Sequence, residues 1–465
     1  MTKASRTFLV EIGVEEIPSR FLESLSDAYC VEMAKALDDA RLLSQNPRVW
    51  STPRRLVFQA EVAARQSVAV ETVRGPALAS AFQDGVATKA LQGFLRRVGM
   101  NAEDLGRTTV GEKDYVTATL EKPVHSADEI LPGLLDRVLA SLPQPRSMRW
   151  GSDDVRFIRP VRWVVAVLDE QVLEGQAFGV AFGKVTYGNR TDHPGALLVS
   201  SVSDYWKALI EGNVTVDVEQ RRRAIRDQGQ ILASQSGGVP DWDPTLLEEV
   251  VNLIEWPTPF LGEMDPKYLD LPEPILVTSM RVHQRYFPIR GPNNRLLPYF
   301  LAVRNGIGED LDAVRHGNQR VLAARLADAQ YFYDLDRKSH LVDHAPDLSG
   351  VTLHAKLGTY HDKIERLGRL FLKTRTWWTL DAQAQNQFER ALRLFKCDLL
   401  TQVVGEFPEL QGEMGGIYAA LDGEEPVVAQ AIQDCFRVKI RSCIVTCHDP
   451  PLGPCASRSI FTKKS

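Results

Sequence analysis

The spacing of apolar residues changes once along this chain, and that change limits the folds open to it. Up to Pro346, short runs of alternating apolar residues are interspersed with longer runs of helical spacing. Beyond Pro346 the spacing is helical almost throughout. Strands and helices repeat with different periods, so one pattern cannot serve both. The sequence therefore predicts a multidomain α+β protein, with a mixed α/β N-terminal region followed by an all-α region.

Individual elements follow from the same periodicity and from turn residues. The first strand is predicted at Thr7–Val14, and Pro18 with Ser19 opens a helix predicted over Arg20–Leu43. A long helix predicted at Asp312–Leu335 should bury one apolar stripe, made of Val314, Val321, Leu322, Leu326, Ala329 and Tyr333. Further strands are predicted at Arg55–Glu61, Tyr115–Leu120, Leu276–Met280, Tyr286–Ile289 and Tyr299–Val303, short β-rich runs between Val155 and Val202, and helices at Ile130–Leu142, Glu219–Ser234 and Thr245–Ile254.

Length and composition indicate a cytoplasmic protein. The chain has 465 residues, enough for about two to four domains with separate cores. It has no run of 18 apolar residues, so no membrane partner is expected. Glu11, Glu15 and Glu16 interrupt any signal-peptide core. Before residue 435 the only cysteines are Cys30 and Cys397, which implies no disulfide framework.

The stretch from Met280 to Arg325 stands out for its arginines. It holds eight arginines, no lysine and only three acids, in a chain whose formal net charge is −5. A guanidinium is a planar fork that binds phosphate through two hydrogen bonds and stacks on flat rings. Aromatic residues such as Tyr286 and Phe300 lie among these arginines, which suits stacking on bases or on the arginines. A solvated face with internal ion pairs explains the same composition.

The order of residues in this stretch resembles that of a known family. M-R-V-H-Q-R-Y-F-P, starting at Met280, and R-H-G-N-Q-R-V-L-A-A-R, ending at Arg325, are similar to the beta subunit of bacterial glycyl-tRNA synthetase. The resemblance covers about the first 430 residues. Further motifs match in order at Phe8–Pro18, Thr52–Leu56, Thr88–Phe94, Ser147–Trp163, Leu357–Lys363, Lys396–Thr401 and Glu406–Gly415.

The resemblance implies a subunit of a heterotetrameric glycine–tRNA ligase of the alpha2beta2 pattern. In that family the alpha subunit activates glycine with ATP, and the beta subunit contributes recognition of tRNA(Gly), with no DNA partner. The expected domains are an α/β region at 1–145, a central α+β region at 146–340 and a helical, degenerate HD-like domain at 341–433. A non-family tail is expected at 434–465, and the family's C-terminal anticodon-binding domain is expected to be absent.

Candidate RNA contacts come from the basic clusters. The arginine-rich stretch contributes Arg281, His283, Arg285, Arg304, Arg315, His316, Arg320 and Arg325. A second cluster includes Arg221 and Arg222 at the start of a helix, where a solvated face is as good an explanation as RNA contact. A third cluster, around Arg156 and Arg162, interleaves with Trp150 and Trp163, which are expected in the core.

No motif for nucleotide chemistry is present in the sequence. There is no G-x-x-x-x-G-K-S/T loop and no G-x-G-x-x-G after a strand. The class I synthetase signatures H-I-G-H and K-M-S-K-S and a convincing class II arginine motif are also missing. No catalytic residue is therefore predicted on this chain, and ATP is expected to be bound by the alpha subunit.

One competing pattern concerns metal chemistry. His354, His361, Asp362 and Asp398 echo the H…HD…D ligands of HD-type phosphohydrolases, which hold divalent metals and activate water. Structural or solvated roles are the more favoured explanation for each of these residues, and no metal is expected on this chain. A metal phosphohydrolase and a non-enzymatic RNA-binding or assembly protein remain as alternative functions.

The tail differs from the rest of the chain. Cys435, Cys443, Cys447 and Cys455 lie in a proline-containing segment with His448, without apolar periodicity. Their spacing lacks the C-x2-C pairs typical of zinc sites. The tail is therefore expected to be a frame-shifted or mis-spliced end that is disordered and binds no zinc.

Overall fold

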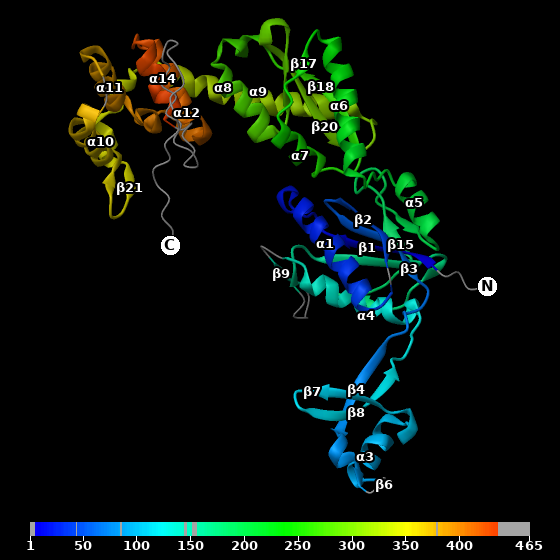
Figure 1. Ribbon diagram of the computed structural model, residues 1–465. Helices are drawn as coiled ribbons and strands as arrows, with labels where there is room; N and C mark the ends of the chain where they lie inside the picture. The colour runs from blue at the N-terminus through cyan, green and yellow to red at the C-terminus, as the bar shows by residue number, and fades with distance from the viewer. Residues whose placement is uncertain are drawn as a thin grey trace. The chain divides into compact units, whose positions relative to one another are not determined.

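The computed structural model describes residues 5–42, 44–83, 86–143, 147–150, 156–377 and 380–435. Its contacts divide the chain into two compact units (Figure 1). Unit 1 comprises residues up to Leu261 together with Leu301–Arg315, and unit 2 comprises Gly262–Phe300 together with the residues from His316 onward.

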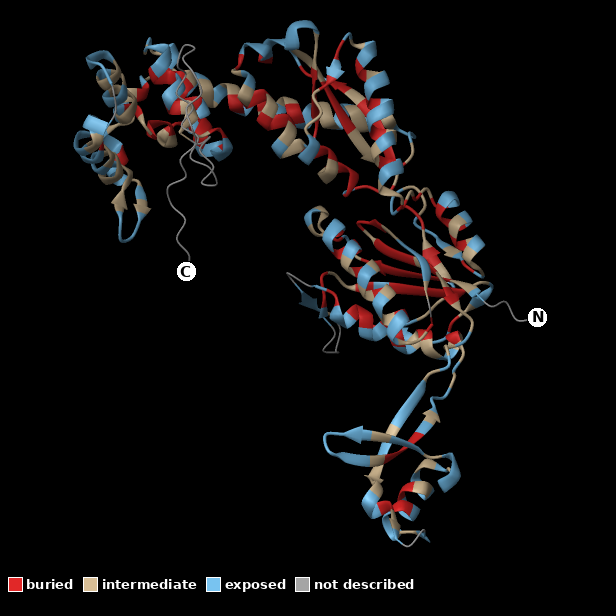
Figure 2. Ribbon diagram, viewed as in Figure 1, coloured by how far each residue is buried: buried red, intermediate tan, exposed pale blue. Residues whose placement is uncertain are grey.

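The core of unit 1 is built on a five-stranded antiparallel sheet in the order β12-β11-β1-β3-β2. Phe8 to Val14 of β1 are buried at every position, because both faces of the sheet are covered. The central strands appear red in Figure 2. The strands predicted at Thr7–Val14 and Arg55–Glu61 are confirmed. The strands are β1 (Ser5–Val14), β2 (Gln45–Thr52), β3 (Arg55–Ala63), β11 (Val161–Leu168) and β12 (Gln171–Val172).

Two long helices contribute to the core on one face of this sheet, α1 (Ser19–Asp39) and α4 (Ala127–Ser141). Helix α1 ends earlier than predicted, because Arg41 adopts a left-handed conformation, with φ of 60°, and turns the chain toward β2. The other face packs against α5 (Val202–Glu211). Since β11 pairs with β1, a domain boundary at 145/146 would cut through this sheet.

A small subdomain is inserted between β3 and α4. Its three-stranded sheet has the order β4-β8-β7, and a core that includes Leu91, Phe94 and Val116 joins the sheet to α3. Thr88 caps α3 by accepting a hydrogen bond from the Leu91 amide. The elements are β4 (Val70–Ala77), α2 (Leu78–Ala81), β5 (Phe82–Gln83), β6 (Val86–Ala87), α3 (Lys89–Val98), β7 (Gly106–Val110) and β8 (Lys113–Glu121).

Short strands and two helices make up most of the rest of unit 1. Trp163 is buried as predicted, and Trp150 packs at the edge of the core, while residues 151–155 between them lie outside the described residues. The helices predicted at Glu219–Ser234 and Thr245–Ile254 are confirmed, and they are capped by Asp217 and Asp243. The elements are β9 (Met148–Arg149), β10 (Arg156–Phe157), β13 (Gln176–Ala177), β14 (Val180–Ala181), β15 (Val185–Tyr187), β16 (Ala196–Leu198), α6 (Val218–Gln235), β17 (Val239–Pro240) and α7 (Pro244–Val251).

The segment predicted as a strand at Leu276–Met280 is helical. Helix α8 (Glu273–Thr278) continues into a π-helix at Ser279–Gln284. The segment is too short to show a helical period, and its polar residues Thr278 and Ser279 are buried together with Leu276 and Met280, so polarity did not mark an exposed face. The two predicted strands that follow this segment are confirmed, as β19 (Phe287–Arg290) and β20 (Leu296–Asn305), and β20 pairs with β18 (Pro257–Glu263).

Helix α9 (Leu311–Asp336) confirms the predicted long helix but corrects part of its buried stripe. Leu322, Leu326 and Ala329 are buried as expected. Val321 is 49% exposed, because it lies about 100° around the helix from Leu322. Val314 and Tyr333 are only partly buried. The boundary between the two units falls within this helix, at Arg315 and His316.

Residues 341–433 are mostly helical, with one small two-stranded sheet of β21 (Thr352–His354) and β22 (Gly358–Thr359). The chain as a whole is a mixed α/β protein. Among the described residues, no helix combines the length and the apolar character needed to span a bilayer. The helices of this region are α10 (Tyr360–Thr374), α11 (Ala382–Leu394), α12 (Gln402–Glu406), α13 (Glu413–Leu421) and α14 (Pro426–Asp434).

The predictions for the cysteine-containing tail, including Cys443, Cys447, His448 and Cys455, lie outside the described residues. Cys435 is the last residue that the structure describes.

Candidate nucleic-acid interface

The motif that begins at Met280 is largely part of the packing of unit 2. Met280 is fully buried, and the ring of His283 stacks on Phe407, with 5.2 Å between centroids and 6° between planes. Nε2 of His283 lies 3.6 Å from Glu409, and only 13% of the side chain is exposed. His283 therefore takes part in the packing of unit 2, and little of its side chain is accessible to RNA. Its ring joins the π-helix to the 406–410 segment.

Arg285 ends the π-helix and is exposed. Its backbone is left-handed, with φ of 59°, and its amide donates to the Met280 carbonyl. The guanidinium donates to the Val282 carbonyl at 2.6 Å, which holds it close to the end of the helix. Arg281, one turn earlier, is partly buried. Of the two arginines, Arg285 is the more accessible to a phosphate.

Tyr286 connects this motif to helix α9. Its ring stacks on Phe300 with 4.5 Å between centroids, and its hydroxyl donates to Oδ1 of Asn318. Burial raises the pKa of Tyr286 to about 12, so the hydroxyl keeps its proton at neutral pH. This contact brings the Arg285 end of the π-helix to the part of α9 around Asn318.

One face of α9 remains exposed from this contact toward the end of the helix. His316 and Arg320 lie four residues apart and are exposed, so they share this face. Within the described part of the chain, no ion pair or hydrogen bond engages either side chain. Tyr331, 65% exposed, lies farther along the same helix. The sequence pattern did not single out Tyr331 as a candidate contact.

Three further candidate arginines of the stretch, Arg304, Arg315 and Arg325, are engaged in ion pairs. Arg304 lies 3.3 Å from Asp192, with 16% of its side chain exposed, and Arg315 donates to the Leu261 carbonyl at 2.9 Å. Arg315 also pairs with Asp312. Arg325 pairs with Glu406 at 2.5 Å. Arg304 and Arg315 belong to unit 1, whereas Arg325 belongs to unit 2. These pairs agree with the alternative interpretation of the arginine-rich stretch, a solvated face with internal ion pairs.

Arg221, a candidate RNA contact, is buried and offers no exposed group to an RNA phosphate. Its guanidinium donates to four backbone carbonyls and reaches no solvent. Burial lowers the pKa of Arg221 to about 10, which still leaves it charged at neutral pH. The four distances are 3.0 Å to Val251, 2.7 Å to Thr215, 2.9 Å to Val216 and 3.0 Å to Ser51.

Arg222, the next residue, is bound by two carboxylates. It forms a forked pair with Glu248, at 2.7 and 2.6 Å, and also pairs with Glu219. Hydrogen bonding to Glu248 raises the pKa of Arg222. Arg221 and Arg222 are therefore committed to contacts within unit 1, and Arg222 does not present a free cation.

Unit 1 contains a buried ionic cluster that the sequence pattern did not predict. The side chain of Arg55 is 0% exposed and lies 3.0 Å from both Glu11 and Glu255. It also donates to the Tyr187 carbonyl at 2.9 Å, while the Thr52 hydroxyl donates to Glu255 at 2.6 Å. The sequence did contain one signal, because Glu11 is the single acid in an apolar run. In the fold, strand β1, which carries Glu11, pairs with strand β3, which carries Arg55.

Burial and charge oppose each other in this cluster. Burial raises the pKa of Glu11, and the positive charge of Arg55 counteracts the rise. For Arg55, burial alone would lower the pKa, but the charges of Glu255 and Glu11 outweigh it and raise the pKa above its ordinary value. The guanidinium is therefore charged and holds two carboxylates inside the fold, which is a structural role.

The candidate metal ligands of the helical region each have another partner. His354 accepts a hydrogen bond from the Lys356 amide at 3.1 Å, and His361 lies 3.5 Å from Glu365 on its own helix. Asp362 caps α10 in a reciprocal pair with Thr359. Hydrogen bonds from the Thr359 amide and hydroxyl lower the pKa of Asp362.

Asp398, the fourth candidate, is buried at the start of α13. Its carboxylate accepts from the amide of Gly412, the residue that precedes this helix, where a negative charge suits the helix dipole. Across the described ranges, no group of three or more His, Cys, Asp or Glu side chains is arranged to hold a metal ion. The four candidates therefore do not form a metal centre in the described structure.

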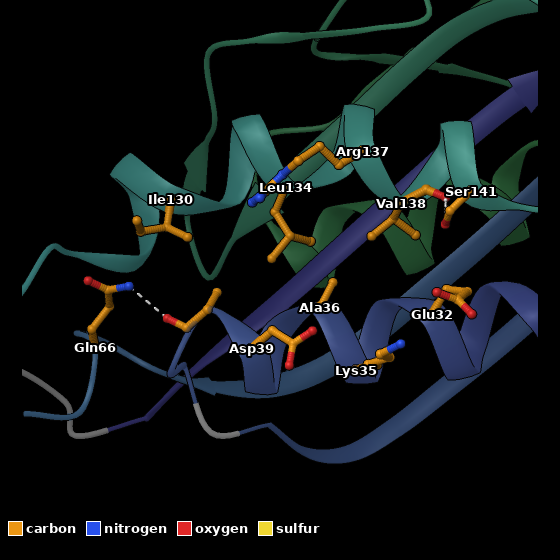
Figure 3. Close-up of a pocket in the computed structure, with 11 residues that line it drawn as sticks. Glu32, Lys35, Ala36, Asp39, Gln66, Ile130, Leu134, Arg137, Val138 and Ser141 are labelled. Carbon is orange, nitrogen blue, oxygen red and sulfur yellow. Dashed lines mark hydrogen bonds between the residues drawn. The ribbon is translucent and has the colours of Figure 1, made fainter. Parts of the chain in front are cut away.

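A groove of about 390 Å³ lies between α1 and α4 (Figure 3). Glu32, Lys35 and Asp39 line it from α1, and Arg137 and Ser141 line it from α4. Both signs of charge are present, and the lining includes neither histidine nor cysteine. Nothing in this lining forms a nucleophile, a general base or a set of metal ligands.

Comparison with known proteins identifies the family. A family model described as glycyl-tRNA synthetase beta subunit matches residues 8–442. The chain belongs to the glycyl-tRNA synthetase beta subunit family. The resemblance noted in the sequence is thereby confirmed.

Several relatives carry the name glycine–tRNA ligase beta subunit. The proteins of Desulforudis audaxviator and Moorella thermoacetica are 43% and 40% identical to this chain over 92% and 93% of it. That of Clostridioides difficile is 39% identical over 91%. In each case the match covers 62% of the relative, so the chain spans less than two thirds of their length.

The motifs that relate this chain to the glycyl-tRNA synthetase beta subunits mostly build its cores. The Thr52–Leu56 motif supplies Arg55 of the buried cluster. The Glu406–Gly415 motif supplies Phe407, which stacks on His283, and Gly412, which donates to Asp398. In this member of the family, these two motifs serve packing, whereas His316 and Arg320 on α9 are exposed.

Proposed function

We propose that this chain acts as the beta subunit of a glycine–tRNA ligase, contributing recognition of tRNA(Gly) and assembly with the catalytic alpha subunit. The observation that carries the proposal is the family match across residues 8–442. It is supported by relatives that are about 40% identical over more than nine tenths of the chain and bear this name. ATP is then a substrate of the complex, bound by the alpha subunit in an alpha2beta2 assembly in the cytoplasm.

The exposed face of α9 is the proposed RNA contact. His316 and Arg320 would meet phosphate oxygens, and Arg285 would add a third cation from the end of the π-helix. Gly317 and Ala324 lie on the same face, and such small residues let a sugar–phosphate backbone approach closely. Tyr331 offers an exposed ring on which an unpaired base can stack. Arg281 and Arg325 are less accessible candidates in the same unit.

Division of labour between subunits gives the first test. The isolated chain should show no glycine-dependent ATP–pyrophosphate exchange, because it has no recognisable nucleotide-binding motif. Mixed with the alpha subunit of Desulforudis audaxviator, it should co-elute in gel filtration, and tRNA(Gly) should bind the mixture more tightly than it binds the alpha subunit alone. Exchange by the pure chain, or no complex with the alpha subunit, would contradict the proposal.

A further inference from the structure

An apolar groove in unit 2 has no role in the proposed RNA contact. It is formed by α10, α11 and α14 and has a volume of about 530 Å³. Leu367, Leu370 and Phe371 line it from α10, Phe388 from α11, and Ala431 and Ile432 from α14. Thr374 is the single polar side chain among its lining residues. Such a lining suits apolar side chains and offers almost nothing to a charged or sugar ligand.

The groove leaves large apolar side chains in contact with solvent. Leu370 is 56% exposed, and Leu380 and Phe388 are 38% and 37% exposed. Phe388 stacks on the buried ring of Phe371, with 4.0 Å between centroids, so the exposed ring is held by the core. Soluble proteins seldom leave such a continuous apolar surface uncovered, since each Å² removed from water contributes roughly 25 cal/mol. We therefore expect another apolar surface to cover this groove.

The position of the groove indicates which polypeptide covers it. Ile432 lies in the last turn of α14, which ends at Asp434, and the family match ends at residue 442, eight residues later. The match covers only 62% of the relatives, so more than a third of their length lies outside the shared region. Polypeptide that continues from α14 would emerge beside the groove.

We propose that the groove is the docking site for the polypeptide that follows α14 in the full-length glycyl-tRNA synthetase beta subunits, entering as an amphipathic helix. Its apolar side chains, three and four residues apart, would cover Leu370 and Phe388. Arg366 and Lys373 are exposed on α10 beside the apolar stripe, so the docking helix should carry acidic residues along its flanks.

A chimera tests this directly. Residues 1–434 of this chain are joined to everything that follows the corresponding position in the Desulforudis audaxviator relative, and compared with the 465-residue chain. In the chimera, amide exchange in α10 and α11 should slow at least tenfold. Fluorescence of the apolar dye anilinonaphthalene sulfonate should fall several-fold, because the covered groove no longer admits it.

Two matched substitutions in the chimera locate the contact. Leu370→Asp lies in the groove, whereas Leu372→Asp changes a residue on the same helix that is 55% exposed and does not line the groove. Since both leucines are exposed, neither change should unfold the helix. Leu370→Asp should restore dye binding and fast exchange in α10, and Leu372→Asp should leave both as in the chimera.

Three results would overturn the proposal. Equal exchange in the chimera and the chain would mean that the continuation does not dock here. Self-association of the 465-residue chain that Leu370→Asp abolishes, seen by sedimentation, would make a second copy the occupant. Protection of α10 in the 465-residue chain on adding the alpha subunit would make that subunit the occupant.

Discussion

Arginine side chains lie in opposite environments in the two units: Arg55 and Arg221 of unit 1 are buried, and Arg320 of unit 2 is exposed. The first two are 0% exposed, and each has its charge or its donors matched inside the fold: Arg55 by two carboxylates, Arg221 by four carbonyls. Arg320 is exposed and has neither kind of partner among the described residues. A buried guanidinium without partners would cost several kcal/mol, so burial and pairing occur together.

The comparison separates arginines that hold the fold from arginines that are available to a ligand. A cluster of arginines in sequence does not reveal this difference, because Arg221 and exposed Arg223 lie two residues apart on one helix. Removing a buried arginine should change stability, and removing an exposed one should change affinity. Four experiments follow, beginning with the largest expected effect.

Replacing Arg55 should have the largest effect on stability. Arg55→Ala leaves the buried carboxylate of Glu11 without its cation and leaves Glu255 only the longer pair with Arg54, at 3.8 Å, which should lower the free energy of unfolding by about 3–5 kcal/mol. Urea unfolding followed by circular dichroism measures the loss. Arg320→Ala should change stability by less than about 0.5 kcal/mol. A small loss in Arg55→Ala would show that the cluster is not needed for folding.

The pair Arg221 and Arg223 sharpens the comparison within one helix. Arg221→Met leaves the buried carbonyls of Ser51, Val216 and Val251 without this donor and should cost about 2–3 kcal/mol in the same urea titration. Arg223→Met removes an exposed guanidinium and should stay within about 0.5 kcal/mol of the unchanged chain. Equal losses from the two variants would mean that burial does not distinguish them.

Affinity for tRNA is the measure for the exposed class. Arg320→Ala should raise the Kd for tRNA(Gly) about three- to tenfold and lower the slope of log K against log salt by about 0.7–0.9, because one phosphate contact is lost. Arg290→Ala is the control, since Arg290 pairs with Glu273 and its side chain is only 16% exposed. Fluorescence anisotropy at several salt concentrations gives both values. If Arg320→Ala leaves affinity and slope unchanged, α9 is not the RNA contact.

The smallest effect concerns the pH dependence at Asp398. Burial raises its pKa above the ordinary value of 3.8, with hydrogen bonding to Gly412 opposing the rise. A carboxyl group with a raised folded pKa contributes stability that is complete below its unfolded pKa and is lost as pH rises through the folded pKa. The stability lost in Asp398→Asn should therefore be larger near pH 4 than at pH 7.

Thermal unfolding of Asp398→Asn and of the unchanged chain across this range gives the difference. The unfolding temperature of the unchanged chain should also be indifferent to EDTA or Mg²⁺, since Asp398 holds the start of α13. A chelator-sensitive unfolding temperature that Asp398→Asn abolishes would instead favour a metal site.

Much of the fold could be predicted from periodicity, because local spacing decides which face of a helix or strand can be buried. The strand at Thr7–Val14 and the helices at Glu219–Ser234 and Asp312–Leu335 were found this way. The segment at Leu276–Met280 was not, because it is too short to show a helical period and its polar residues Thr278 and Ser279 are buried together with the apolar ones.

The candidate site could be predicted only in part. The arginine-rich stretch drew attention to Arg320 and His316, which are exposed, but also to His283 and Arg304, which are packed or paired. Their partners, Phe407 and Asp192, lie more than 100 residues away in the chain, so no local pattern could reveal them.

The sequence by itself determined the family, the order of most helices and strands, and the absence of recognisable nucleotide-binding motifs, because these depend on residue identity and short-range spacing. The tertiary structure alone decided which arginines are buried, which are paired and which remain open. That decision rests on desolvation, which depends on every group that surrounds a side chain. Arg55 and Glu255 are 200 positions apart in the sequence, so only the folded chain brings them together.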